Sequence, residues 1–175
     1  MTAGVPRAYC RGLTIRDSTD SDFATITAIT NPIIATTAIH FGYEPLADDD
    51  LVTLWRSQRA QFPWLTMEQD GAVLGYAKAG TWRPRAAYQW TCETTIYMAE
   101  AARGQGLGRA LYTALLAACK ARGFRSAIGA ITLPNPASVA LHEALGFVAV
   151  GVVKDAGKKL DRWHDVGFWQ RMLSP

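Results

Sequence analysis

The chain has 175 residues, of which 49% are hydrophobic and 19% are charged, and its formal net charge is +3. This length and balance suit a single domain with a buried core, which we expect to span residues 1–175 with residues 1–11 as a loose lead-in. The charge is small and no run of lysine or arginine stands out, so nothing in the composition favours nucleic acid as a partner.

The first half of the chain predicts a strand, two helices and a hairpin. Leu13–Arg16 alternates in polarity and contains β-branched residues, which is typical of a strand. The polar run 17–22 offers N-caps for a helix that Pro32 interrupts. A second helix is predicted over residues 48–61, and Asp70-Gly71 lies between two strand-like runs, which strongly predicts a β-hairpin.

The second half alternates strands with helices. Leucine or cysteine recurs every four residues from Leu107 to Cys119, which predicts a helix that Gly123 ends. The remaining predicted elements are strands at 90–98 and 126–131, a helix at 135–145, strands at 147–153 and 163–173, and a loop at 154–162. This order predicts an α+β fold with a mixed sheet.

Export and membrane insertion are not expected. Residues 1–12 lack the apolar stretch of a signal peptide, and the longest mostly apolar run, 144–153, is too short to span a bilayer. Cys10, Cys92 and Cys119 are widely spaced and form no Cys-x-x-Cys pair, which favours reduced thiols in a cytoplasmic protein. The histidines have no ligand spacing to one another, so we expect no metal.

The segment Arg103-Gly-Gln-Gly-Leu-Gly-Arg109 directly precedes the predicted helix. Glycine permits close approach of the backbone to a ligand, and the free N–H groups and dipole of a helix start favour an anion. A glycine-rich turn without a ligand is the alternative interpretation. The segment contains no Gly-Lys-Ser/Thr and no Gly-x-Gly-x-x-Gly, so neither a P-loop nor a dinucleotide motif is predicted.

The pattern Arg103-x-x-Gly106-x-Gly108 resembles the pyrophosphate-binding motif of the GCN5-related N-acetyltransferases (GNAT). The segment from Asn135 to Phe147 is similar to the next helix of that superfamily. Segments 82–97, 133–146 and 163–171 resemble its phosphinothricin and methionine sulfone acetyltransferase branch. The resemblance extends from about Leu13 to Leu173, and three motifs in register make it specific.

This resemblance implies an acetyl-CoA-dependent N-acetyltransferase with the GNAT fold, which is a mixed, mostly antiparallel sheet of about seven strands flanked by helices. It implies that the strands near 91–98 and 125–131 splay apart, so that free backbone groups can bind pantetheine and polarise the thioester carbonyl. It also implies a homodimer. The implied cofactor-binding residues are Ile96, Tyr97, Met98, Arg103, Gly104, Gln105, Gly106, Leu107, Gly108, Arg109, Asn135 and Ser138.

Two side chains are candidates for the chemistry. Transfer to an amine needs a base, because the ammonium of an amino acid is protonated at neutral pH. Glu93 is a carboxylate in an apolar strand, where burial would raise its pKa, and it matches the proposed catalytic glutamate of the family. His142 shares a helix face with Asn135 and Ser138 and is the candidate acid for the leaving thiolate. A solvent-facing glutamate and a structural histidine are the alternatives.

We expect residues of two loops to form the acceptor site. Arg83 and Arg85, with Tyr88, precede the catalytic strand, and two guanidinium groups suit an anionic amino-acid analogue. A solvated basic loop is the alternative. Phe41 matches an aromatic residue of the family's substrate pocket. Gly42 departs from the arginine that follows this aromatic in phosphinothricin-type enzymes, which leaves room for methionine sulfone or sulfoximine.

The predicted function is therefore transfer of an acetyl group from acetyl-CoA to the α-amine of a small amino-acid analogue, with Glu93 as general base. One alternative keeps the fold but uses another small amine, such as a polyamine or aminoglycoside. Arginines near the acceptor site disfavour a cationic acceptor. A second alternative is a non-catalytic acyl-CoA-binding module, which the presence of Glu93 and His142 disfavours.

Overall fold

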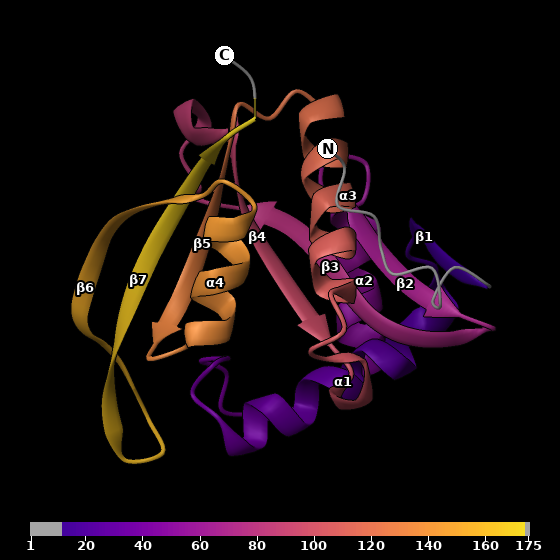
Figure 1. Ribbon diagram of the computed structural model, residues 1–175, viewed down its shortest axis with the longest axis horizontal. Helices are drawn as coiled ribbons and strands as arrows, with labels where there is room; N and C mark the ends of the chain where they lie inside the picture. Colours follow the sequence, from indigo (N-terminus) through magenta and orange to yellow (C-terminus); the bar gives the residue numbers. More distant parts are fainter. Residues whose placement is uncertain (1–11, 174–175) are drawn as a thin grey trace.

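A seven-stranded sheet forms the centre of the computed structural model, which describes residues 12–173 (Figure 1). The strand order is β1-β2-β3-β4-β5-β7-β6, and all neighbours are antiparallel except β4 and β5. The predicted α+β fold with a mostly antiparallel mixed sheet is thus confirmed. The expected lead-in at 1–11, with Cys10, lies outside the described residues. The strands are β1 (Leu13–Asp17), β2 (Trp64–Gln69), β3 (Ala72–Thr81), β4 (Thr91–Met98), β5 (Ser126–Leu133), β6 (Val148–Lys159) and β7 (Arg162–Met172).

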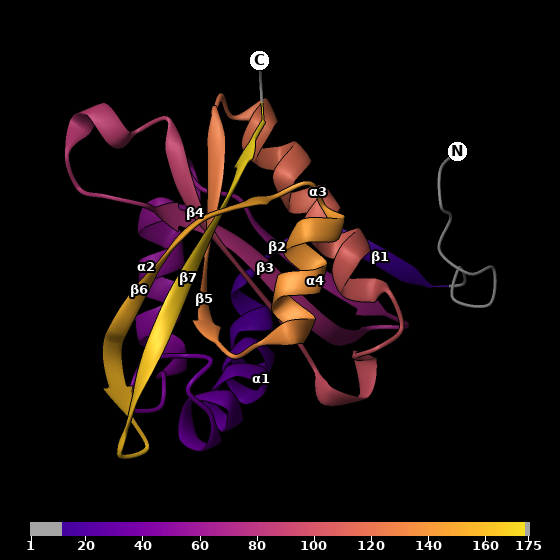
Figure 2. The same cartoon turned by 60° about the vertical axis from the view of Figure 1, so that its left-hand side comes forward.

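Helices cover both faces of the sheet (Figure 2). Helix α3 packs on β2, β3 and β4, and α4 packs on β5, whereas α1 packs on β3, β4 and α2 from the opposite face. The helices are α1 (Phe23–Thr36), α2 (Asp48–Gln58), α3 (Leu107–Ala121) and α4 (Pro136–Ala144). None of the helices in residues 12–173 has both the length and the hydrophobicity that a membrane span requires.

The core is divided between the two faces. On the α3 side, Leu107, Leu111, Leu115 and Cys119 are at most 1% exposed, so the predicted four-residue periodicity marks the buried stripe of α3. On the other side, α1 and α2 cover a separate group of buried apolar residues that is rich in aromatic rings, namely Phe23, Ile26, Leu51, Trp55, Trp64 and Tyr76. The sheet thus lies between two buried clusters, and their packing fixes the position of β4.

The predicted turn chemistry is confirmed at the first hairpin. Asp70 and Gly71 have φ angles of 50° and 83°, as a tight primed turn between β2 and β3 requires. Pro32 does not interrupt the first helix as expected, because it lies inside α1 and the helix continues to Thr36.

The predicted loop at 154–162 is wrong. Strand β6 continues to Lys159 and pairs with β7, with register shifts near Ala149 and between Val153 and Gly157. The polar, glycine-containing sequence is typical of a loop, but these irregularities let the strand bend without losing its partner. Leu160 and Asp161, both with positive φ, form the turn of this long hairpin.

Strands β4 and β5 separate after a short parallel contact. Only Thr91, Cys92 and Glu93 of β4 pair with β5, and Glu93 lies opposite Ile128 in the last pair. The strands then continue to Met98 and Leu133 without pairing with each other, and Figure 1 shows their ends diverging toward α1. The implied splay is confirmed, and it leaves one backbone edge of residues 94–98 unpaired.

Candidate active site

A glycine-rich turn opens helix α3. Gly104 and Gly106 have φ angles of 73° and 77°, a left-handed conformation that glycine adopts without strain. The N–H groups of residues 104–108 donate to no carbonyl group in the described part of the chain. A phosphate group binds where hydrogen-bond donors and positive charge come together. This turn offers both, from its free N–H groups, the positive end of the α3 dipole, and the flanking Arg103 and Arg109.

A groove of about 490 Å³ runs from this turn along β4 to α4. Most of the predicted cofactor-binding residues line it, namely Ile96, Tyr97, Met98, Arg103, Gly104, Gly106, Gly108, Arg109, Asn135 and Ser138. Gln105 and Leu107 do not: the Gln105 side chain donates to the Ala101 carbonyl at 2.6 Å, and Leu107 is 1% exposed in the core. Leu107 can therefore offer a ligand only its backbone N–H, and the Gln105 side chain is directed back to Ala101.

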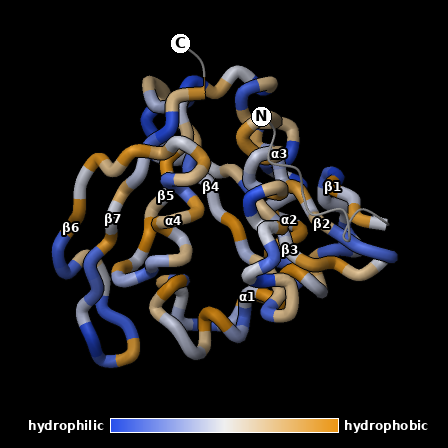
Figure 3. The backbone as a smooth tube through the Cα atoms, in the orientation of Figure 1, coloured by the Kyte–Doolittle hydropathy of each residue, from blue (hydrophilic) through white to orange (hydrophobic). Residues whose placement is uncertain are grey.

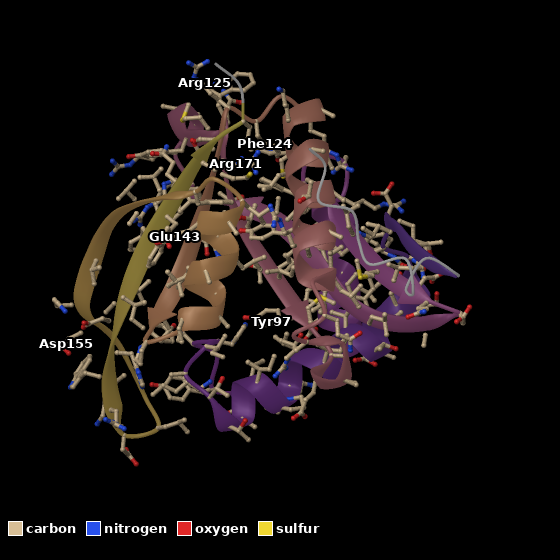
Figure 4. The ribbon with its side chains drawn as sticks, in the orientation of Figure 1. Tyr97, Phe124, Arg125, Glu143, Asp155 and Arg171 are labelled. Atoms are coloured by element: carbon tan, nitrogen blue, oxygen red, sulfur yellow. The ribbon has the colours of Figure 1, made fainter. Side chains whose placement is uncertain are left out.

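A second cavity of about 400 Å³, here called the acceptor pocket, lies between β3, β4, β5 and the loop before α2. It shares Ile39, Ile96, Tyr97, Asn135 and Ser138 with the groove, so the two cavities meet between the separated strands. Figure 4 shows Tyr97 between the open ends of β4 and β5. A ligand held along the groove would therefore end at the acceptor pocket.

Glu93 lines the acceptor pocket at the point where β4 leaves β5. Its carboxylate makes no hydrogen bond or ion pair with a described residue. Burial raises the pKa of Glu93, whereas the positive charges of Lys78 and Arg83 lower it. A half-buried carboxylate with free lone pairs and a raised pKa has the properties of a general base.

His142 is 4% exposed and belongs to a hydrogen-bonded network beneath the pocket. Its Nδ1 lies 2.8 Å from the Ser138 carbonyl, so Nδ1–H donates and Nε2 accepts from the Tyr112 hydroxyl at 2.9 Å. The Tyr112 hydroxyl also lies 2.6 Å from Thr94 Oγ1 of β4. Burial lowers the pKa of His142, and this favours the neutral imidazole. Both ring nitrogens of His142 are thus occupied by hydrogen bonds within the protein.

Phe41 also lines this second cavity, the acceptor pocket. Its ring packs on Gly157 of β6, where a Cβ atom would lie only 2.4 Å from Phe41 Cε2. The Lys159 ammonium donates to the carbonyl oxygens of Ile34 and His40, both at 2.6 Å. The β6–β7 hairpin thereby holds the loop that positions Phe41.

Arg83, Arg85 and Tyr88 do not line the acceptor pocket within the described residues. They lie on the exposed connection between β3 and β4, with Tyr88 in the short 3₁₀ turn Ala86–Tyr88. The Arg83 guanidinium stacks over the Trp82 ring at 4.8 Å and acts on Glu93 through its charge. Their role in acceptor binding stays a prediction.

Comparison with known proteins decides the family. Residues 33–147 match the model of the acetyltransferase (GNAT) family. The chain belongs to the GNAT acetyltransferase family. It is 44% identical over 161 residues to phosphinothricin N-acetyltransferase of Streptomyces viridochromogenes, covering 92% of this chain and 88% of that protein. It is 36% identical over 166 residues to the L-methionine sulfoximine/L-methionine sulfone acetyltransferase of Pseudomonas paraeruginosa, covering 92% and 95%.

Solved structures agree with this assignment. An acetyltransferase from Salmonella typhimurium with its cofactor acetyl-CoA superposes with a TM-score of 0.90 at 32% identity, covering 94% of this chain and 95% of that one. A GNAT phosphinothricin acetyltransferase from Sinorhizobium meliloti in complex with acetyl-CoA gives a TM-score of 0.87 at 35% identity, covering 92% and 88%. The chain is thus a GNAT N-acetyltransferase.

Sequence reasoning missed several polar groups of this GNAT acetyltransferase site. Tyr112 and Thr94 carry the network of His142, and Lys78 and His40 line the acceptor pocket. Lys78 did have a signal in the sequence, because it alternates with Ala77 and Ala79, which face the core, and so must face the other side of β3. Tyr112 had no such signal in the sequence, because it is adjacent to the leucines of an apolar helix and resembles another core residue.

Proposed function

We propose that this protein transfers an acetyl group from acetyl-CoA to the α-amine of a small amino-acid analogue, with Glu93 as the general base. The observation that carries the proposal is the position of Glu93. It is an unpaired, half-buried carboxylate at the junction of the acceptor pocket with a groove suited to a phosphate-bearing ligand.

The groove fits acetyl-CoA. The free N–H groups of residues 104–108, together with Arg103 and Arg109, would hold the pyrophosphate. The unpaired edge of residues 94–98 would accept the pantetheine amides and donate to the thioester carbonyl. Acetyl-CoA, when bound, supplies the acetyl group as a thioester, so that an amide bond to the acceptor nitrogen replaces a bond to sulfur.

Glu93 would remove a proton from the acceptor ammonium, directly or through one water molecule, and so make the amine nucleophilic. His142 would supply the proton for the leaving thiolate. The Ser138 carbonyl accepts from Nδ1–H and the Tyr112 hydroxyl bonds Nε2; burial raises the pKa of Tyr112, so the tyrosine keeps its proton and orients the imidazole. Burial lowers the pKa of His142, so this step requires that the imidazole be protonated when the thiolate leaves.

The choice of acceptor rests on the relatives, whose names give phosphinothricin and methionine sulfoximine or sulfone. Phe41 at the pocket supports an acceptor with an apolar methyl end. We retain Arg83, Arg85 and Tyr88 as proposed acceptor contacts, because the positive charge of Arg83 already acts at Glu93. A glycine at position 42 brings no charge, which leaves room for methionine sulfone or sulfoximine as well as phosphinothricin.

We further propose a homodimer in the cytoplasm. Strand β6 is an edge of the sheet and exposes an apolar row comprising Val148, Val150, Val152 and Val153, each at least 49% exposed. Figure 3 shows this hydrophobic stretch in the upper part of β6, above the mostly hydrophilic lower part of the β6–β7 hairpin. An exposed apolar edge suits burial against a second copy. Among the described residues Cys92 and Cys119 are free, which is compatible with a reducing compartment.

A thiol-release assay with acetyl-CoA tests the function. The panel contains phosphinothricin, methionine sulfone, methionine sulfoximine, ordinary amino acids and a polyamine. We expect turnover of the amino-acid analogues, with N-acetylated products by mass spectrometry. Selective turnover of the polyamine would overturn the acceptor class, and no turnover of any amine despite acetyl-CoA binding would favour a non-catalytic module.

A further inference from the structure

Lys78 is the single lysine or arginine among the described residues that line the acceptor pocket. It lies in the middle of β3, opposite Thr95 of β4. Its sequence neighbours Ala77 and Ala79 are at most 1% exposed and face the core under α3. Since side chains alternate along a strand, Lys78 extends toward the pocket with Tyr76.

The Lys78 ammonium has no anionic partner within residues 12–173. Its Nζ lies 4.6 Å from the centre of the Trp64 ring, which is 2% exposed, and it makes no hydrogen bond or ion pair there. Burial lowers the pKa of Lys78, and the charge of Glu93 opposes that effect. A cation–π contact compensates for only part of the cost of removing an ammonium from water. This position is therefore suited to an anion that a ligand brings.

Lys78 and Glu93 are diagonal neighbours on one face of the sheet. Thr95 is opposite Lys78, Gly80 is opposite Glu93, and such neighbours have Cβ atoms roughly 7 Å apart. No ion pair joins the two charged groups, and both side chains line the acceptor pocket, so a small zwitterion bound there would meet both charges. An α-amino acid carries its ammonium and its carboxylate on one carbon atom.

We propose that Lys78 determines acceptor specificity by binding the α-carboxylate of the acceptor, while Glu93 receives the ammonium. The inference rests on the proposed amino-acid acceptor and adds the residue that recognises it. It explains how the pocket can select amino acids although Arg83 and Arg85 lie outside its lining. Amines without a carboxylate would lose this contact and would meet an unpaired cation.

The alternative is that Lys78 influences only the ionisation of Glu93 and does not contact the acceptor. The two roles differ in what they predict for an uncharged acceptor. Loss of a carboxylate contact affects the acid but not its carboxamide, because the carboxamide has no negative charge to bind. A change at Glu93 alone affects both acceptors equally, since both need the same base.

The experiment compares Lys78→Met, Lys78→Arg and the exposed control Lys120→Met with methionine sulfone and methionine sulfone carboxamide as acceptors. We expect Lys78→Met to raise KM for the acid about 10- to 100-fold, the usual effect of losing a hydrogen bond to a charged group. KM for acetyl-CoA and the unfolding midpoint should stay near the wild-type values. Lys78→Arg should recover part of the loss, and the carboxamide should be turned over as well as by wild type or better.

Equal losses for acid and carboxamide, or an unchanged KM for the acid, would overturn the role of Lys78 and leave the proposed function intact. The proposed function fails separately if wild-type protein acetylates neither methionine sulfone nor any other amino acid. Calorimetry with methionine sulfone then decides the binding role, because the inference requires that Lys78→Met weakens binding and that Lys120→Met does not.

Discussion

The Tyr112 hydroxyl lies 2.9 Å from His142 Nε2 and joins α3 to α4 beneath the acceptor pocket. The same hydroxyl lies 2.6 Å from Thr94 Oγ1 of β4, so one buried tyrosine connects the histidine to the strand that carries Glu93. Gly129 of β5 leaves the space that the imidazole fills, since a Cβ there would lie 2.4 Å from Nε2. The orientation of His142 is thus set by three other elements.

Replacement of Tyr112 by phenylalanine should destabilise the protein and slow turnover. The change leaves His142 Nε2 without its donor in a buried site, which costs about 1–3 kcal/mol. Urea denaturation measures the loss, and the pH profile of kcat shows whether loss of this hydrogen bond changes the titration of the imidazole. Wild-type stability together with a wild-type pH profile would contradict the network.

Replacement of Gly106 by alanine should weaken acetyl-CoA binding. A φ of 77°, as at Gly106, costs residues other than glycine about 1–2 kcal/mol. Relief of that strain in the variant would move the free N–H groups of residues 104–108. We expect KM for acetyl-CoA to rise about tenfold, as 1.4 kcal/mol corresponds to a factor of 10. Gly123→Ala is the matched control, because its φ is 86° at the far end of α3. Equal effects of both changes would contradict a specific role of residues 104–108 in acetyl-CoA binding.

Replacement of Lys159 by methionine should loosen the loop that carries Phe41. The Lys159 ammonium, 4% exposed, donates to Ile34 at the end of α1 and to His40, and hydrogen bonds to charged groups contribute about 1.5–3 kcal/mol each. We expect faster hydrogen exchange in residues 37–46 and a raised KM for the acceptor. Lys158→Met, at an exposed neighbouring side chain, should change neither. Unaltered exchange in the Lys159 variant would show that the hairpin does not hold the loop.

Activity should rise with pH through the pKa of Glu93. The base acts when deprotonated, and burial holds its pKa above the usual glutamate range, so kcat/KM should fall at a higher pH than an exposed carboxylate would give. Arg83→Ala should move this acidic limb to still higher pH, because the arginine charge lowers the pKa. An Arg83 variant with the limb at lower pH would contradict the electrostatic assignment.

The sequence predicted the fold well because its signals were local. The glycines before α3, the Asp70-Gly71 turn and the stripe from Leu107 to Cys119 each depend on a few neighbouring residues. The end of β6 was missed, because its pairing depends on β7 and on irregular positions that a polar sequence does not mark. In the site, alternation along β3 indicates which face Lys78 lies on, but its contact with Trp64 depends on tertiary packing. Tyr112 acquires its partners only by tertiary packing, so spacing along the chain could not identify it.

The most direct test of the account is Glu93→Gln, which keeps the shape of the side chain and removes the base. We expect kcat to fall at least about 100-fold, the usual contribution of general-base catalysis, with an unchanged KM for acetyl-CoA. The folded protein raises the pKa of Glu93, so the ionised carboxylate lowers stability as pH rises through that pKa, and the variant should be at least as stable as wild type at neutral pH. A variant that retains near-normal kcat in the thiol-release assay would contradict the central claim that Glu93 is the general base.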